Sequence, residues 1–277
     1  MGGASYPAGV TSIVGEALEL STTLASIGIP GMETKQALIY NPNYDFRLHI
    51  NPAITAVLFY DASNDAGARF EKVGTTDSLT RDLTDRSATG SGSALDSGTT
   101  SDRLYIGLAD IIGGLHIDMT SSVNTNASVM TVKYWNGSAW ADITVTDATK
   151  EGGATSLQAS GDLIWTVPTD WVSAHLGGNN FDGTIKGMSI TDKDAPGSYG
   201  FWLQIYWSAA LSSDVEMANI WTLNKDTSHR GYFHGGQEYP ISFDARVVGG
   251  IEAVIDEAKI EAGGTDTMEI TWIRTII

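Results

Sequence analysis

Histidine and carboxylate side chains are the residues of this chain most able to do chemistry, because the sequence contains no cysteine. That absence excludes disulfides, cysteine-ligated zinc and thiol catalysis. His116 and Asp118 stand two residues apart, so they would share one face of a strand. Such a pair could bind a metal ion or serve as a general base, and the polar face of an antiparallel sheet explains it equally well.

A second group of potential ligands lies in a glycine-rich stretch and consists of His229, His234 and Glu238. Spacings of five and four residues could bring the three around a metal ion. The stretch lacks the HExxH pattern and has no third histidine close by. Hydrogen bonding within an ordered loop is therefore the favoured interpretation.

Carboxylates are frequent, with 33 Asp and Glu residues against 16 Lys and Arg. A glycosidase needs two carboxylates at a fixed separation in a cleft, and nothing in the sequence selects a pair. The stretch 179–183 offers oxygen ligands for calcium but lacks the spacing of a calcium loop. The motifs GxGxxG, GxxxxGKS/T and GxSxG are also absent. The sequence therefore gives no support for nucleotide chemistry, and we expect no cofactor.

The tryptophans all lie beyond residue 130, and Trp202 and Trp207 stand in the most aromatic segment, 199–207. Rows of exposed tryptophans stack on sugar rings or anchor interfaces. Core packing is the simpler interpretation, since strand alternation would bury about half of the rings. Alternation places Leu203, Ile205 and Trp207 on one face of this strand, and Trp202, Gln204 and Tyr206 on the other.

The clearest local signal is the pair Asn136 and Gly137, which separates two alternating segments. Both central residues of a type I′ turn need positive φ, and asparagine and glycine tolerate it best. The sequence therefore predicts a β-hairpin that turns at these two residues. Trp135 and Trp140 flank the turn, and we expect them to brace it across the two strands.

Short alternating segments separated by turn residues continue along most of the chain. Threonine, serine, glycine and aromatic residues are prominent, which favours strands and turns over helices. We expect an all-β protein, a β-sandwich or jelly roll with long loops and very little helix. A single helical turn is expected over residues 170–175, after Pro168.

Composition divides the chain into four regions. Residues 1–12 are small and glycine-rich, and we expect a flexible arm. Residues 13–101 form an N-terminal β region with a long acidic loop rich in glycine, serine and threonine. Residues 102–228 are expected to form a central β-sandwich module. Residues 229–277 supply strands that complete the sheet or form an assembly interface.

The charge balance is strongly acidic, with a formal net charge of −17 at pH 7. Such a surface repels nucleic-acid phosphates and anionic membranes, so neither is an expected partner. The first residues lack the basic start of a secretory signal. No apolar run approaches the roughly 20 residues of a membrane span. We expect synthesis in a cytoplasm.

An ordered series of motifs resembles a β-rich module in structural proteins of tailed bacteriophages. In that family a Tyr-Trp-Asn/Asp-Gly-Ser-x-Trp hairpin precedes a Thr-Asp-Gly-Thr turn, a Pro-x-Asp-Trp segment and a Ser-Ala-Ala-Leu-Ser turn. The corresponding residues here are 134–140, 146–149, 168–171 and 208–212. Ala148 stands where the family often has glycine. The resemblance covers about residues 104–223.

This resemblance implies a non-enzymatic component of a tailed phage particle, which reaches the virion by assembly. It carries over no catalytic residue. Modest size, acidity and the lack of a fibrous repeat favour a capsid-decorating or cementing protein, with a tail, neck or baseplate component as the close alternative. The expected partners are other virion proteins and further copies of this chain, in a trimer or a higher homo-oligomer.

Two other classes of function stay open. A carbohydrate-binding module for host attachment would present an exposed aromatic row, with Trp202 and Trp207 as candidates. A hydrolase would hold two carboxylates at catalytic separation in a cleft.

Overall fold

The structure is a computed structural model, and it describes residues 10–20, 25–28, 34–40, 44, 46–60, 70–72, 83, 92–95, 98–175, 199–223, 231–233, 239–242, 248–255 and 266–275. Every regular element within these ranges is a β-strand. The all-β prediction is confirmed, and the antiparallel sheets pack against each other as in a β-sandwich. No helix long and apolar enough to span a membrane occurs in these ranges.

The helical turn expected over residues 170–175 is wrong. Asp170 lies in a turn, and the chain then continues as strand β14 (Ser173–His175). This strand pairs antiparallel with β15 (Tyr199–Trp207), where Ala174 stands opposite Gly200. Pairing with a neighbouring strand satisfies the backbone groups that a single isolated helical turn would leave without partners.

The strands form four antiparallel sheets, which we name A to D. Sheet A contains, in order, β1 (Val10–Leu20), β20 (Asp266–Thr275), β3 (Thr34–Tyr40) and β18 (Tyr239–Ser242). Sheet B contains β17 (Gly231–Phe233), β4 (Phe46–Pro52), β19 (Val248–Ile255) and β2 (Ala25–Gly28).

Sheets C and D are built from the middle of the chain. Sheet C contains, in order, β11 (Trp140–Ile143), β10 (Met130–Trp135), β15, β8 (Arg103–Leu108), β5 (Ile54–Tyr60) and β6 (Phe70–Lys72), with β14 beside β15. Sheet D contains β12 (Thr146–Asp147), β13 (Gly161–Ile164), β9 (Gly114–Met119), β16 (Glu216–Leu223) and β7 (Ser93–Ala94).

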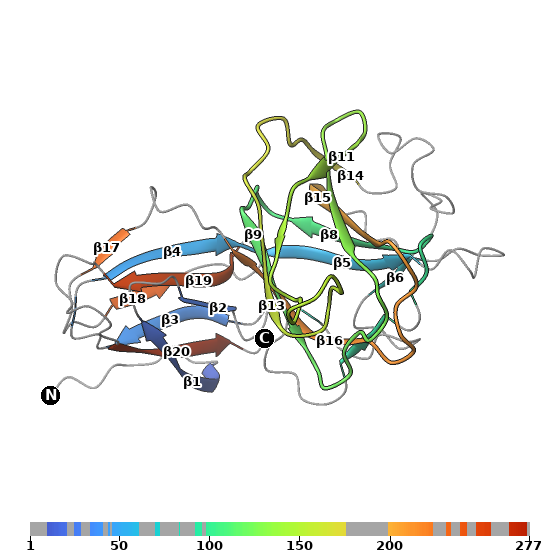
Figure 1. The fold of residues 1–277 in the computed structure, drawn as a ribbon. Helices are drawn as coiled ribbons and strands as arrows, with labels where there is room; N and C mark the ends of the chain where they lie inside the picture. Colours follow the sequence, from blue (N-terminus) through green and yellow to red (C-terminus); the bar gives the residue numbers. More distant parts are fainter. Residues whose placement is uncertain are drawn as a thin grey trace, which may run out of the picture.

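Two sandwiches result (Figure 1). The terminal sandwich consists of sheets A and B and combines both ends of the described chain. Its buried apolar side chains come from both sheets and include Ile39, Phe46, Leu48, Ile251, Ala253, Met268 and Ile270. The central sandwich consists of sheets C and D and holds most of the buried apolar side chains among the described residues.

The core of the central sandwich follows strand alternation. Leu203, Ile205 and Trp207 of β15 all belong to it, as the alternation of this segment predicted. Leu115 and Ile117 of β9 face them from sheet D. Complete burial of one such side chain contributes about 1.5–3 kcal/mol, so this core supplies most of the stability of the sandwich.

The central sandwich is inserted into the terminal one, and the chain passes between them at two adjacent places. On the way in, only Ala53 separates β4 from β5. The chain returns to the terminal sandwich after Leu223, at the end of β16. Asn51 Nδ2 donates to the carbonyl oxygen of Thr222 at 2.8 Å, and Thr222 Oγ1 donates to the carbonyl oxygen of Pro52 at 2.6 Å. The two passages are therefore bonded to each other.

The division of the chain into four regions stays a prediction. The described strands within residues 13–101 are distributed over all four sheets. The strands within residues 229–277 pair with strands from the first 52 residues, in sheets A and B.

Candidate functional site

The predicted hairpin lies between β10 and β11, where Trp135 stands opposite Trp140. The connecting loop is therefore 136–139, and Asn136 is not among the residues with positive φ. The type I′ turn expected at Asn136 and Gly137 is wrong. Gly137 alone adopts positive φ, at 93°.

Asparagine has a different function in this loop. Asn136 Oδ1 accepts hydrogen bonds from the backbone N of Ser138 at 3.0 Å and of Ala139 at 2.8 Å. The backbone N of Asn136 donates to the carbonyl oxygen of Ala139 at 3.1 Å. The side chain thus closes the turn, as short polar side chains commonly do in turns. The rings of Trp135 and Trp140 meet edge to face at 5.5 Å and brace the strands.

The Pro-x-Asp-Trp segment packs against this hairpin. Tyr134 Oη donates to Asp170 Oδ1 at 2.6 Å, and this hydrogen bond raises the pKa of the Tyr134 hydroxyl. The ring of Trp171 meets the ring of Tyr134 edge to face at 5.9 Å. The backbone N of Val172 donates to the carbonyl oxygen of Trp135 at 3.1 Å. Two motifs separated along the chain therefore form one packed unit.

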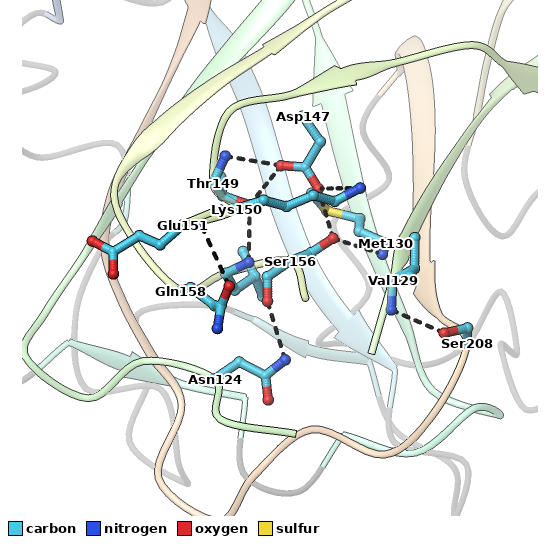
Figure 2. Close-up of polar contacts among 11 residues, drawn as sticks. Asn124, Val129, Met130, Asp147, Thr149, Lys150, Glu151, Ser156, Gln158 and Ser208 are labelled. Atoms are coloured by element: carbon cyan, nitrogen blue, oxygen red, sulfur yellow. Dashed lines mark hydrogen bonds and ion pairs between the residues drawn. The ribbon is translucent and has the colours of Figure 1, made fainter. Parts of the chain in front are cut away.

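The Thr-Asp-x-Thr turn is centred on a buried carboxylate, and Figure 2 shows its contacts. The side chain of Asp147 is 6% exposed. Its Oδ1 accepts from the N of Thr149 at 2.9 Å and from Thr149 Oγ1 at 2.6 Å. Its Oδ2 accepts from Ser156 Oγ at 2.6 Å, and Lys150 Nζ lies 3.7 Å away. These donors compensate the cost of removing the charge from water.

Ser156 connects this turn to neighbouring segments (Figure 2). Ser156 Oγ accepts from the backbone N of Met130 at 2.9 Å, where β10 begins. Asn124 Nδ2 donates to the carbonyl oxygen of Ser156 at 3.0 Å. Leu157, at a φ of 62°, donates its N to Thr149 Oγ1 at 2.9 Å. The network fixes an unfavourable left-handed backbone at Leu157, which needs such support.

The backbone of this turn and of its neighbouring strand explains why two positions are occupied by small residues. Ala148 is not among the positive-φ residues, so alanine fits where the phage family often has glycine. A Cβ at Gly161 would collide with the carbonyl oxygen of Ala148, so close approach of the two backbones requires glycine there.

The Ser-Ala-Ala-Leu-Ser turn binds the segment that precedes β10. Ser208 Oγ accepts from the N of Val129 at 2.9 Å (Figure 2), and Ser128 Oγ donates to the carbonyl oxygen of Ala209 at 2.8 Å. The N of Ser212 donates to Asn124 Oδ1 at 3.1 Å. Asn124 thus contacts both this turn and Ser156. The motifs that carry the resemblance form a single hydrogen-bonded scaffold.

His116 belongs to a separate cluster on the outer face of sheet D. Its Nδ1 lies 2.7 Å from Asp162 Oδ1, and its Nε2 lies 3.2 Å from Asp118 Oδ1. The imidazole stacks on Trp221, with ring centroids 4.1 Å apart. Strand register produces this arrangement, because Asp162 and Trp221 stand opposite His116 on β13 and β16.

The charge state of His116 follows from these contacts. Burial lowers the pKa of the imidazole, and the hydrogen bonds to Asp118 and Asp162 outweigh it, so the pKa is raised above the usual 6.5. When both ring nitrogens face carboxylate oxygens, both act as donors only in the imidazolium form. A protonated imidazole has no lone pair with which to act as a base or to ligate a metal.

Metal binding gains no support from the described part of the chain, in which no three His, Cys, Asp or Glu side chains come together as a metal site would require. The metal alternative for His229, His234 and Glu238 lies outside the described residues. The calcium alternative at residues 179–183 lies outside them as well.

Trp202 and Trp207 are both buried, with exposed fractions of 0% and 1%. Trp202 Nε1 donates to the carbonyl oxygen of Ala174 at 2.8 Å, and the ring of Trp207 packs against Phe59 at 6.2 Å. A Cβ at Gly107 would lie 2.8 Å from the Trp202 ring, so glycine makes room for it. Neither ring presents a face to a sugar, and this burial counts against the carbohydrate alternative at these two residues.

Sequence reasoning missed Asp162 and Ser156, and it gave Asn124 no role of its own. Several of their contacts join distant positions: Asp162 is 46 positions from His116, and Asn124 is 32 positions from Ser156. The Thr-Asp-x-Thr and Ser-Ala-Ala-Leu-Ser motifs are local signals near this network.

Comparison with protein-family models, with curated proteins and with solved structures found no match to this chain. The resemblance to phage structural proteins therefore stays a prediction.

Proposed function

We propose that this protein is a non-enzymatic structural component of a tailed bacteriophage particle, located in the virion, where it decorates or cements the capsid. The observation that carries the proposal is the scaffold around Asn124, Asp147 and Ser156. All four phage-like motifs contribute to holding the central sandwich together, directly or through the hairpin. Motifs that stabilise a fold in this way support a common architecture with the phage proteins, and they do not indicate a common reaction.

Charge and composition also support this proposal. A net charge of −17 favours solubility at high copy number and disfavours direct contact with the packaged genome. The absence of cysteine leaves packing, hydrogen bonds and contacts between subunits as the sources of stability. Other virion proteins and further copies of this chain are the proposed partners.

The copy number of the protein in purified phage particles tests the proposal. Quantitative mass spectrometry is expected to give a copy number comparable with that of the major capsid protein, and cryo-electron microscopy is expected to place it on the capsid surface. A copy number of only a few would instead indicate the tail, neck or baseplate. A particle that contains none of this protein would contradict every structural assignment.

A cementing function makes a further prediction about particle stability. Particles assembled without this protein are expected to release their DNA at a lower temperature than complete particles, because contacts between capsid subunits are lost. Adding the purified protein back should restore the release temperature. Equal release temperatures with and without the protein would contradict cementing.

A further inference from the structure

The loop residues Asn136 and Gly137 are able to react with each other. An asparagine followed by glycine loses its side-chain amide spontaneously in water, because glycine has no Cβ to keep its backbone N away from the asparagine side chain. The sequence contains this pair only once. Gly137, Ser138 and Ala139 are exposed, so water reaches the site. Within the described part of the chain, the N of Gly137 donates no hydrogen bond that would occupy it.

The reaction exchanges one amide bond for another and ends in hydrolysis. The backbone N of Gly137 attacks Cγ of Asn136 and forms a C–N bond, which closes a succinimide ring. The bond between Cγ and Nδ2 breaks, and Nδ2 leaves as ammonia with the proton that the Gly137 N gives up. A water molecule then opens the ring at either carbonyl carbon and leaves aspartate or isoaspartate at position 136. Solvent water is the only co-reactant.

The folded loop restrains the Asn136 side chain against this reaction. Its Oδ1 accepts from the N of Ser138 at 3.0 Å, from Ser138 Oγ at 3.0 Å and from the N of Ala139 at 2.8 Å. All of these donors belong to residues beyond Gly137. Ring closure turns Cγ onto the Gly137 N and carries Oδ1 with it, so these bonds must loosen first. The bond from the N of Asn136 to the carbonyl oxygen of Ala139 restrains the loop backbone as well.

The donors to Oδ1 also have an opposite effect, and the two effects must be compared. Negative charge develops on Oδ1 during the attack, and donors aimed at that oxygen would stabilise it as an oxyanion hole does. Such donors help only where they face the position of the oxygen in the transition state. Here they face its position in the ground state, because the backbone N–H groups of a closed loop do not follow the side chain. Restraint is therefore the larger effect, at roughly a factor of two to ten for each bond.

We propose that Asn136 is a site of spontaneous deamidation that the folded hairpin keeps latent, and that opening of the loop 136–139 sets the rate of the reaction. The product depends on which ring bond water opens. Aspartate keeps a side-chain oxygen that accepts from Ser138 and Ala139. Isoaspartate adds a carbon atom to the backbone, so it lengthens the loop that joins the packed rings of Trp135 and Trp140. The inference does not rest on the phage assignment.

Comparison of the folded with the unfolded chain measures the protection. The full chain is incubated at mildly alkaline pH in buffer and in guanidinium chloride, and mass spectrometry gives the deamidated fraction of the tryptic fragment 134–150. This fragment contains no other asparagine or glutamine. We expect deamidation in the folded chain to be slower by roughly tenfold or more, because several bonds must open together. Equal rates, or a faster reaction in the folded chain, would overturn the proposal.

Ser138→Ala tests the hydrogen bonds to Oδ1 directly. The substitution removes the hydroxyl donor and retains both backbone donors. We expect the rate in the folded chain to rise by about two- to tenfold, while the rate in the unfolded chain stays that of the wild type. Ser138→Thr keeps a hydroxyl and is the matched control, with a folded-chain rate close to that of the wild type. An unchanged folded-chain rate in Ser138→Ala would contradict the proposal.

Thr222→Val separates opening of the loop from unfolding of the whole chain. This substitution removes a hydrogen bond at the junction between the sandwiches and leaves the loop intact. Because loop opening sets the rate, Asn136 should deamidate in this variant as it does in the wild type. A rate that rises with the loss of stability would assign the reaction to globally unfolded chains, and the proposal would then be wrong. Far-ultraviolet circular dichroism checks that all variants are folded, which the exposed position of Ser138 favours.

Discussion

His116 illustrates how neighbours across a sheet decide what a residue does. The sequence placed it on one strand face with Asp118, and the structure adds Asp162 and Trp221 from the flanking strands. With two carboxylates and one aromatic face around it, the imidazole serves as a charged cross-link between β9 and β13. Catalysis or metal binding would need one free ring nitrogen, and neither nitrogen is free here.

This arrangement predicts a pH-dependent contribution to stability. The folded-state pKa of His116 lies above its unfolded value near 6.5, so the contribution is fully present below pH 6.5 and disappears as the pH rises through the folded pKa. His116→Phe keeps the stacking on Trp221 but removes the charge. In urea unfolding it should be less stable than the wild type by about 1 kcal/mol at pH 6.

Raising the pH from 6 to 9 is expected to reduce this difference in stability, because the contribution of the charged imidazole disappears as the pH rises through its raised folded pKa. The variant and the wild type share all other carboxylates. The difference between their free energies of unfolding therefore cancels the contribution of those groups to the pH dependence. Asp162→Asn provides the control, since it should lower the pKa of His116 in an NMR titration. A stability difference that stays constant between pH 6 and pH 9 would contradict the cross-link.

At the scale of elements, the β10–β11 hairpin shows which local signals are reliable. Its position followed from Asn136 and Gly137, but its turn type did not. Asn136 tolerates positive φ and is also a good side-chain acceptor, and the sequence does not say which property is used. Alternation likewise predicted the core face of β15. It did not predict burial of Trp202 on the opposite face, because periodicity says nothing about what covers a sheet.

Gly137→Val is expected to destabilise the hairpin, because Gly137 has a φ of 93° and a Cβ there would approach Val172 at 3.3 Å. A β-branched residue is strongly disfavoured at such a φ. We expect a loss of about 1–3 kcal/mol in the free energy of unfolding, measured by chemical denaturation. Gly153→Val, on an exposed glycine without positive φ, is the matched control and should change stability far less. Equal stability of the two variants would show that the hairpin assignment is wrong.

At the scale of the whole molecule, the nested arrangement of the two sandwiches was not predictable. The pairing of β1 with β20 joins residues at opposite ends of the chain, and Asn51 bonds to Thr222 across 171 positions. Composition and periodicity describe neighbours in sequence, so they indicate strands but not which distant strands meet. The all-β class could be predicted from the sequence, because it depends only on local patterns.

The bonded passages between the sandwiches predict that the two unfold together. Thr222→Val removes the hydroxyl that donates to Pro52 while keeping a similar shape. We expect it to separate a single calorimetric transition into two, or to lower the midpoint of the terminal sandwich, because it removes one of the two hydrogen bonds described at the junction. Thr131→Val, on the half-exposed face of β10, should leave the transition unchanged. An unaltered transition in Thr222→Val would show that this bond does not couple the sandwiches.

The inserted position of the central sandwich has a consequence for synthesis on the ribosome. All strands of sheets C and D emerge before β20, so the central sandwich can fold while the chain is still growing. Strands β1 and β3 must wait for β20, which pairs with both. At about 5–20 residues per second, this delay for β1 is roughly ten to fifty seconds. During that interval the strands at the beginning of the chain are exposed to chaperones and to neighbouring nascent chains.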